Sequence, residues 1–413
     1  MLLGFLLVMN VMAPMRDGVK LATDVYLPEK EGKYPVLLYR TPYNKDGQKG
    51  AAAYFNKFGY AVVVQDCRGR FKSEGEFYPF VNEGKDGYDT IEWAAAQPWS
   101  NGKVGTIGGS YLAWDQYHAA MYKPPHLVAM FAIVGGANLL NEYGHPGGTP
   151  NPGWPMWILN SAMSSPAAQR DPDGRAALAS AAKNPREWLA LHPRERSKVF
   201  APFPDHKKIY DDMYAHTELD SYWKQRGFYT AGYFGEMKDV PVLFLSGWYD
   251  YFGDGLLDTY MALSKRQRTM KRLVMGPWPH GVGAATCGDG NFGERAALDA
   301  QALAVDWFDH WMKGDPLEPV NAHPVRYFRM GGGDGGRDEK GRLQHGGAWL
   351  TAPAWPLPNA RGEKFYLRQG GALAKQPAKG APASFVFDPE DPVPTIGGRY
   401  AGAGTPGCFQ DQI

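Results

Sequence analysis

Short apolar runs alternate with segments of helical spacing over the first third of the chain. The helical segments lie at 90–97 and 111–121, where apolar residues recur every three or four positions. Buried strands separated by helices predict a parallel sheet with helices on both faces, which is the α/β class. The expected strands of this part are 19–27, 35–40, 59–65, 104–107 and 127–134.

The pattern changes twice further along. Helical segments rich in Trp and Tyr predict a helical cap inserted into the sheet domain. Strands are then expected at 240–250 and 272–280, and a helix at 296–313. Later runs at 324–328, 364–367 and 384–387 lie among Gly and Pro, as in a β-sandwich. The predicted organisation is a sheet domain in two parts (1–137 and 239–316), the cap (138–238) and a C-terminal sandwich (317–413).

Composition narrows the class of partner. The 413 residues are enough for more than one domain, and the net charge of +1 comes without long runs of one sign. Nothing therefore attracts the chain to nucleic acid or to an anionic membrane, and we expect a small-molecule partner. The sequence leaves open whether the chain forms a homo-oligomer.

The three cysteines and the N-terminus carry little functional signal. Cys67, Cys287 and Cys408 lie far apart without a CxxC pair, which excludes a zinc-finger framework and allows at most one disulfide. The apolar start, residues 1–8, has no positive residue before it and no cleavage site after it, so we expect an N-terminal strand, or the scar of a truncation at an internal start, rather than a signal peptide. No apolar run approaches the ~18 residues that a membrane span needs.

A serine stands where an apolar strand turns into a helix. Gly108, Gly109 and Ser110 separate the run 104–107 from the helix 111–121, which is the pattern of a nucleophile elbow. Small neighbours are required because the helix must pack closely on the strand. The fifth position of the G-x-S-x-G pattern holds Leu112, so the motif alone is only half met.

Two further residues complete a catalytic constellation. Asp250 and His280 each follow a predicted buried strand, and the order Ser110, Asp250, His280 is that of the α/β-hydrolase fold. The serine would be the nucleophile, the histidine its base and the aspartate the group that orients the base. Tyr43 follows an early strand at the same edge of the sheet, where a phenol can donate to an oxyanion. Asp66 and Arg68 are expected to pair and hold that edge.

Taken together, the motifs resemble the cocaine esterase family (CocE/NonD-type hydrolases), which includes X-prolyl dipeptidyl-peptidases, α-amino acid ester hydrolases and glutaryl-cephalosporin acylases. The resemblance implies that Ser110, Asp250 and His280 form the triad. It also implies that the hydroxyl of Tyr43 and the backbone N–H of Tyr111 form the oxyanion hole. The motifs that carry it are Arg40–Tyr43, Gln65–Arg70 with Ser73–Gly75, Asp86–Asp89 with Trp93, Trp99–Gly105, Gly109–Tyr111, Gly247–Asp250 and Gly276–His280.

The resemblance further implies an α/β-hydrolase fold with a cap, followed by a jelly-roll β-sandwich. The segment 317–413 holds too few strands for a complete sandwich, so we expect an incomplete jelly roll. Two explanations stay open: the chain is a fragment of a longer protein, or its reading frame was broken. The expected substrate is a small-molecule ester, amide or peptide, and the reaction requires no metal or cofactor. Four activities stay open: X-Pro dipeptide release, ester hydrolysis, side-chain deacylation of β-lactams and hydrolysis of α-amino acid esters. A non-catalytic remnant also stays open.

Overall fold

The computed structural model describes residues 6–319, 322–377, 382, 384–393, 397–399 and 408. Its centre is a ten-stranded sheet in the order β1-β2-β4-β3-β5-β6-β7-β8-β11-β13. The seven neighbours from β4 to β11 run parallel, and antiparallel strands flank them on both sides. The strands are β1 (Leu6–Pro14), β2 (Lys20–Leu27), β3 (Tyr34–Thr41), β4 (Ala61–Asp66), β5 (Ser100–Gly109), β6 (Leu127–Ile133), β7 (Val242–Gly247), β8 (Lys271–Gly276), β11 (Val325–Met330) and β13 (Gly347–Ala352).

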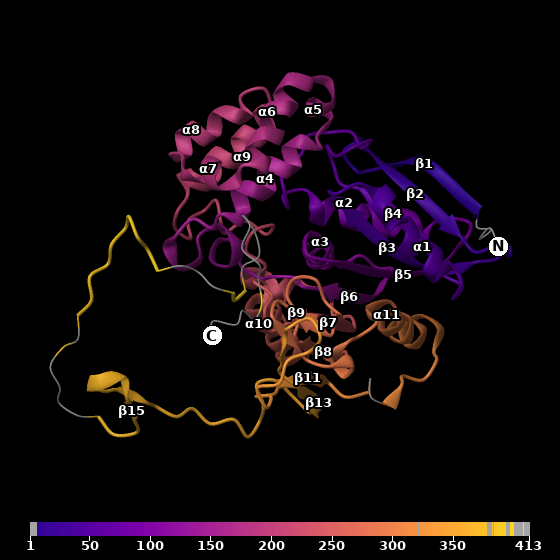
Figure 1. Ribbon diagram of the computed structural model, residues 1–413. Coiled ribbons are helices and arrows are strands. Elements are labelled where there is room, and N and C mark those ends of the chain that lie inside the picture. Colours follow the sequence, from indigo (N-terminus) through magenta and orange to yellow (C-terminus); the bar gives the residue numbers. More distant parts are fainter. Residues whose placement is uncertain are drawn as a thin grey trace.

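Helices cover both faces of this sheet, as Figure 1 shows. On one face, Val62 and Val64 of β4 belong to the apolar cluster that also contains residues of α1 (Lys49–Asn56) and α11 (Ala300–Phe308). On the other face, Ala61 and Val63 belong to the cluster that contains residues of α2 (Glu83–Ala95), α3 (Tyr111–Met121) and α10 (Gly253–Arg266). Since successive side chains of a strand point to opposite faces, a strand buried on both must be apolar at nearly every position. The predicted α/β class is therefore confirmed.

Of the N-terminal run 1–8, residues 1–5 lie outside the described residues, and residues 6–8 belong to strand β1, which pairs with β2 in an antiparallel register. Within the described part of the chain, no helix is both long and apolar enough to cross a membrane.

The regular elements between β6 and β7 are all helical in the described residues, and the assignment of this segment as a cap stays a prediction. Figure 1 shows them as one group, coloured magenta to pink, beside the sheet. The helices are α4 (Gly153–Met163), α5 (Pro166–Arg170), α6 (Pro172–Lys183), α7 (Pro185–Ala190), α8 (Pro193–Ser197) and α9 (Pro204–Ala215). Short helical turns join them at η2 (Leu140–Gly144), η3 (Pro146–Gly148), η4 (Lys198–Phe200) and η5 (Thr230–Glu236).

The predicted helix 296–313 is shorter than expected. The side chain of Asp299 accepts hydrogen bonds from the backbone N–H groups of Gln301 and Ala302, so α11 begins only at Ala300. After Phe308 the chain continues as a π-turn, η7 (Asp309–Lys313). The remaining short elements are η1 (Lys45–Gln48), β9 (Thr286–Cys287), β10 (Gly290–Asn291), η6 (Glu294–Ala296), β12 (Leu343–Gln344), β14 (Tyr366–Leu367), η9 (Gln369–Gly371) and β15 (Leu373–Ala374).

The C-terminal segment differs from the predicted sandwich. Strand β11 pairs with β8 and thereby extends the main sheet, and β13 pairs with β11. The expected strand at 384–387 does not form, and Phe385 and Val386 are 88% and 95% exposed. An apolar run favours a strand, but a strand also needs a neighbour, and none lies beside this run in the described residues. The jelly roll is therefore not confirmed.

A disulfide joins the C-terminal part of the chain to strand β9. Cys287 in β9 bonds to Cys408, 121 positions later, with 5.6 Å between their Cα atoms. This is the single disulfide that the cysteine count allows, and Cys67 is free and buried. In Figure 1 the yellow segment around β15 loops away from the body before the chain returns.

Candidate active site

Ser110 occupies the turn between β5 and α3 in a strained conformation, with φ 60° and ψ −124°. Positive φ is costly for a residue with a Cβ, and such strain is typical of a nucleophile held clear of the sheet. A Cβ on Gly108 would lie 2.4 Å from the Cβ of Leu112, so this position must be glycine for α3 to pack here. The predicted strand–turn–helix geometry is thus present.

Asp250 and His280 meet at the same edge of the sheet. Their loops follow β7 and β8, and the Nδ1 atom of His280 lies 2.9 Å from Oδ1 of Asp250. The carboxylate of Asp250 is fully buried, and its Oδ2 accepts a hydrogen bond of 2.7 Å from the hydroxyl of Ser246. The histidine is partly exposed, with 27% of its side chain open to solvent. This arrangement fixes the imidazole ring while one side of it stays accessible.

The two loops are held together by their backbones. The backbone N–H of Trp248 donates to Gly276 at 2.9 Å, and that of Tyr249 donates to Trp278 at 3.0 Å. A Cβ on Gly247 would lie 2.0 Å from the carbonyl oxygen of Trp278, so only glycine permits this approach. The neighbouring strands β7 and β8 therefore place Asp250 and His280 side by side.

Tyr43 lies in the turn after β3, and its hydroxyl accepts a hydrogen bond of 3.1 Å from Nε1 of Trp157 in the cap helix α4. Burial raises the pKa of the Tyr43 phenol to about 12, while hydrogen bonds with Trp157 and Ser110 act in the opposite direction. The phenol is therefore protonated at neutral pH and its hydroxyl faces Ser110. The residue as a whole is 49% exposed.

Tyr111 begins α3, where the first backbone N–H groups of a helix have no intrahelical acceptor. Its side chain is buried, and its hydroxyl both donates and accepts a hydrogen bond. The hydroxyl donates to Oε1 of Glu83 at 2.9 Å and accepts from the backbone N–H of Phe80 at 2.8 Å. The anchored ring holds the backbone N–H of Tyr111 at the elbow, directly after Ser110.

A continuous series of aromatic rings connects the histidine with Tyr43. His280 stacks on Tyr251 at 4.4 Å between ring centroids, and Tyr251 stacks on Tyr143 at 5.2 Å. Tyr143 meets Trp154 edge-on, and Trp154 stacks on Trp157 at 5.1 Å. The sequence showed that segment 138–238 is rich in aromatic residues, but it did not show that some of these rings form a series between His280 and Tyr43.

The predicted pairing of Asp66 with Arg68 is wrong. Arg68 binds Asp86 instead, through Nε at 2.9 Å and Nη2 at 2.6 Å, and it also pairs with Asp17 at 2.8 Å. The carboxylate of Asp66 accepts a hydrogen bond from the backbone N–H of Lys45 at 2.7 Å. The reason is that α2 begins at Glu83, earlier than the predicted residue 90, which places Asp86 against Arg68.

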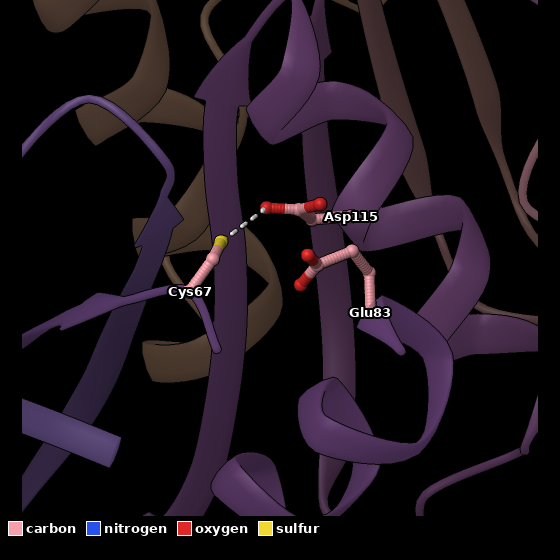
Figure 2. Close-up of side chains that lie close together, drawn as sticks. All are labelled: Cys67, Glu83 and Asp115. Atoms are coloured by element: carbon pink, nitrogen blue, oxygen red, sulfur yellow. Dashed lines mark hydrogen bonds between the residues drawn. The ribbon is translucent and has the colours of Figure 1, made fainter. Parts of the chain in front are cut away.

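A buried polar cluster that the sequence did not predict lies behind the elbow. Figure 2 shows Cys67, Glu83 and Asp115 converging, with Sγ of Cys67 3.8 Å from Oδ2 of Asp115. One ligand atom from each lies within 4.8 Å of the others, a spacing that a metal ion could use. However, Nη1 of Arg40 already pairs with Oε2 of Glu83 at 2.7 Å.

Burial also changes the titration of two groups in this cluster. It raises the pKa of the Cys67 thiol and of the Asp115 carboxyl well above their usual values. The guanidinium of Arg40 contacts Glu83 at 2.7 Å and Asp86 at 3.9 Å. Because an arginine already fills this position, we assign the cluster a structural role between α2 and α3.

Comparisons with known proteins show the family of this chain. The family model described as X-Pro dipeptidyl-peptidase (S15 family) matches residues 17–282. Cocaine esterase from Rhodococcus sp. (strain MB1 Bresler) is 32% identical over 416 residues, which cover 94% of this chain and 69% of the esterase. The chain belongs to the X-Pro dipeptidyl-peptidase (S15) family. The resemblance inferred from the motifs is thus confirmed.

Solved structures of the family share the fold. A CocE/NonD family hydrolase from Staphylococcus aureus has a TM-score of 0.64 at 23% identity, covering 88% of this chain and 59% of its own. An α-amino acid ester hydrolase has a TM-score of 0.73 at 23% identity, and the match covers 94% of this chain and 66% of the hydrolase. The chain therefore spans only part of the length of these relatives, and its fold is that of the α/β hydrolases in the family.

Proposed function

We propose that this protein is a serine esterase that acts through an acyl-enzyme. Ser110 attacks the carbonyl carbon of the substrate, and His280 takes the serine proton on its accessible nitrogen while Asp250 holds the other nitrogen. The observation that carries the proposal is the His280–Asp250 contact at 2.9 Å, at the sheet edge where Ser110 stands strained on its elbow.

The developing oxyanion would be bound by two donors. The phenol of Tyr43 accepts its hydrogen bond from Trp157, which leaves its own O–H free to turn toward the reacting centre. The backbone N–H of Tyr111 is the second donor. His280 then returns its proton to the leaving alcohol, and water releases the acyl group from Ser110 by the same steps in reverse.

The aromatic rings between His280 and Tyr43 favour a substrate with an apolar acyl group. Rings of Tyr251, Tyr143 and Trp157 extend from the histidine to Tyr43, and aromatic surfaces favour aromatic or branched apolar groups. A substrate with a free ammonium group would instead need an unpaired carboxylate. Glu142 lies next to Tyr143, but Oε1 accepts hydrogen bonds from the backbone of Ala137 and Asn138, both at 2.9 Å.

The protonation of Glu142 also disfavours a substrate with a free ammonium group. Burial raises the pKa of its carboxyl to about 8, so much of it is uncharged at neutral pH and offers little attraction to an ammonium group. For this reason we favour ester hydrolysis over release of X-Pro dipeptides or hydrolysis of α-amino acid esters.

The test is labelling by a fluorophosphonate probe, combined with turnover of p-nitrophenyl benzoate and of Ala-Pro-p-nitroanilide. The protein should be labelled and should cleave the ester faster than the anilide. Ser110→Ala should abolish labelling and lower kcat by a factor on the order of 10⁴ or more. Ser180→Ala, at an exposed serine of α6, is the matched control and should be labelled normally. Labelling of Ser110→Ala would refute the nucleophile, and faster cleavage of the anilide would refute the substrate class.

A further inference from the structure

Arg70 is a buried guanidinium bound entirely to uncharged oxygen atoms. The side chain is 1% exposed. Its Nε donates to the carbonyl of Pro42 at 3.0 Å, Nη1 to the carbonyl of Ser161 at 3.0 Å, and Nη2 to the hydroxyl of Ser164 at 2.7 Å. Among the described residues it has no carboxylate within ion-pair distance. A buried charge without a counter-ion is costly, so the arrangement calls for a role beyond packing.

The three acceptors lie on the two segments that place Tyr43. Pro42 immediately precedes Tyr43, so the Nε bond fixes the backbone of the turn that carries the phenol. Ser161 lies on α4 one helical turn after Trp157, whose indole donates to the hydroxyl of Tyr43. Arg70 thus joins the backbone that carries the phenol to the helix that holds its hydroxyl.

The planar fork of an arginine is suited to this geometry. Its donors point in fixed directions, whereas a lysine offers one flexible point charge and can satisfy at most part of the set. The rings of Phe71 and Phe77 lie 5.2 and 4.9 Å from the guanidinium carbon and limit its movement. Burial lowers the pKa of Arg70 to about 10, so the group remains charged at neutral pH.

We propose that Arg70 is a positioning residue that presents the hydroxyl of Tyr43 to the oxyanion by clamping the Tyr43 turn to helix α4. The inference rests on the proposed role of Tyr43. It adds that the alignment of that donor depends on a residue that does not touch the substrate. Because a misplaced donor acts on the transition state more than on bound substrate, its loss should lower kcat and leave KM nearly unchanged.

The experiment is a double-mutant cycle between Arg70→Lys and Tyr43→Phe, with ester turnover as the readout. Arg70→Lys should lower kcat by about tenfold, and Tyr43→Phe by a factor on the order of 10² to 10³. In the double variant, kcat should match that of Tyr43→Phe within about twofold, because the clamp has no donor left to place. Arg196→Lys, at a buried arginine of the cap, is the matched control and should keep wild-type kcat.

The outcomes distinguish the oxyanion role of Tyr43 from the positioning role of Arg70. If Tyr43→Phe leaves kcat unchanged, the proposed oxyanion role of Tyr43 fails, and the inference fails with it. If Tyr43→Phe is slow but Arg70→Lys lowers kcat equally in both backgrounds, or not at all, only the clamp is refuted.

A milder variant covers the case in which Arg70→Lys does not fold. Ser164→Ala removes one acceptor of the clamp, and we expect a two- to fivefold lower kcat in the wild-type background and no change in the Tyr43→Phe background, as for other partial losses of alignment. Unchanged kcat of Ser164→Ala in the wild-type background would overturn the proposal.

Discussion

The Nδ1 atom of His280 lies 2.9 Å from Oδ1 of Asp250, and the second oxygen of that carboxylate is bound by Ser246 at 2.7 Å. The aspartate therefore cannot rotate freely, and only one of its oxygens serves the histidine. A fixed acceptor at Nδ1 selects the tautomer in which the other ring nitrogen is free to accept a proton.

Asp250→Asn tests this relationship with little change of shape. The amide can turn an NH₂ group toward Nδ1, which would reverse the tautomer and remove the base, so kcat should fall by a factor on the order of 10⁴. Ser246→Ala removes only the support of the other oxygen and should cost about tenfold. Steady-state ester hydrolysis measures both. An asparagine variant with more than a tenth of wild-type kcat would contradict the role of Asp250.

Local patterns in the sequence were sufficient for the parts of the site that lie on the chain next to regular elements. The elbow at Ser110 follows from a short apolar strand, small residues and a helical period, and the structure shows the strained backbone at that residue. Asp250 and His280 could be located because each follows a buried strand, and parallel strands end at the same edge of a sheet.

Contacts between distant segments could not be predicted in this way. Arg68 was expected to bind its neighbour Asp66, but the earlier start of α2 supplied Asp86 instead. The clamp of Arg70 depends on where α4 packs, which no local pattern encodes. The run at 384–387 has the composition of a strand but no neighbouring strand, since pairing is decided by tertiary structure.

A second prediction concerns acid stability and His118 on α3. The ring is buried against Phe80 and Trp114, and neither of its nitrogens has a hydrogen-bond partner in the described residues. Burial lowers the pKa of His118 to about 3, and the positive charge of Arg40 adds to the effect. Between about pH 6.5 and pH 3 the unfolded chain binds a proton that the folded chain does not, so stability is lost as pH falls through this window.

His118→Phe should flatten this loss, because it keeps an apolar ring and removes the titrating group. We expect the fall in unfolding free energy between pH 7 and pH 4 to shrink by up to about 3 kcal/mol relative to wild type. Urea unfolding at both pH values measures it, and the comparison within each variant cancels any change in packing. His323→Phe, at an exposed residue, is the control and should keep the wild-type slope. An unchanged slope in His118→Phe would show that this ring does not govern the acid sensitivity.

The last prediction concerns the exposed segment that lies between β13 and Cys408 in the sequence. Leu367, Phe385 and Val393 are each 88% exposed, whereas strands β4, β7 and β8 are buried throughout. A protease needs an extended, accessible backbone, so chymotrypsin should cut near Phe385 and Phe387 well before it cuts the sheet.

The disulfide determines what that cut releases. Cys287 lies before the cleavage site and Cys408 after it, so the two pieces should stay joined until a reductant is added. Mass spectrometry should show one nicked species without reductant and two fragments with it, the larger one containing Ser110, Asp250 and His280. Cys287→Ser should release the small fragment without reductant. Separation of the wild-type pieces under non-reducing conditions would contradict the disulfide. Resistance of this segment for as long as the sheet survives would instead mean that another surface, such as a second copy of the chain, covers its apolar residues.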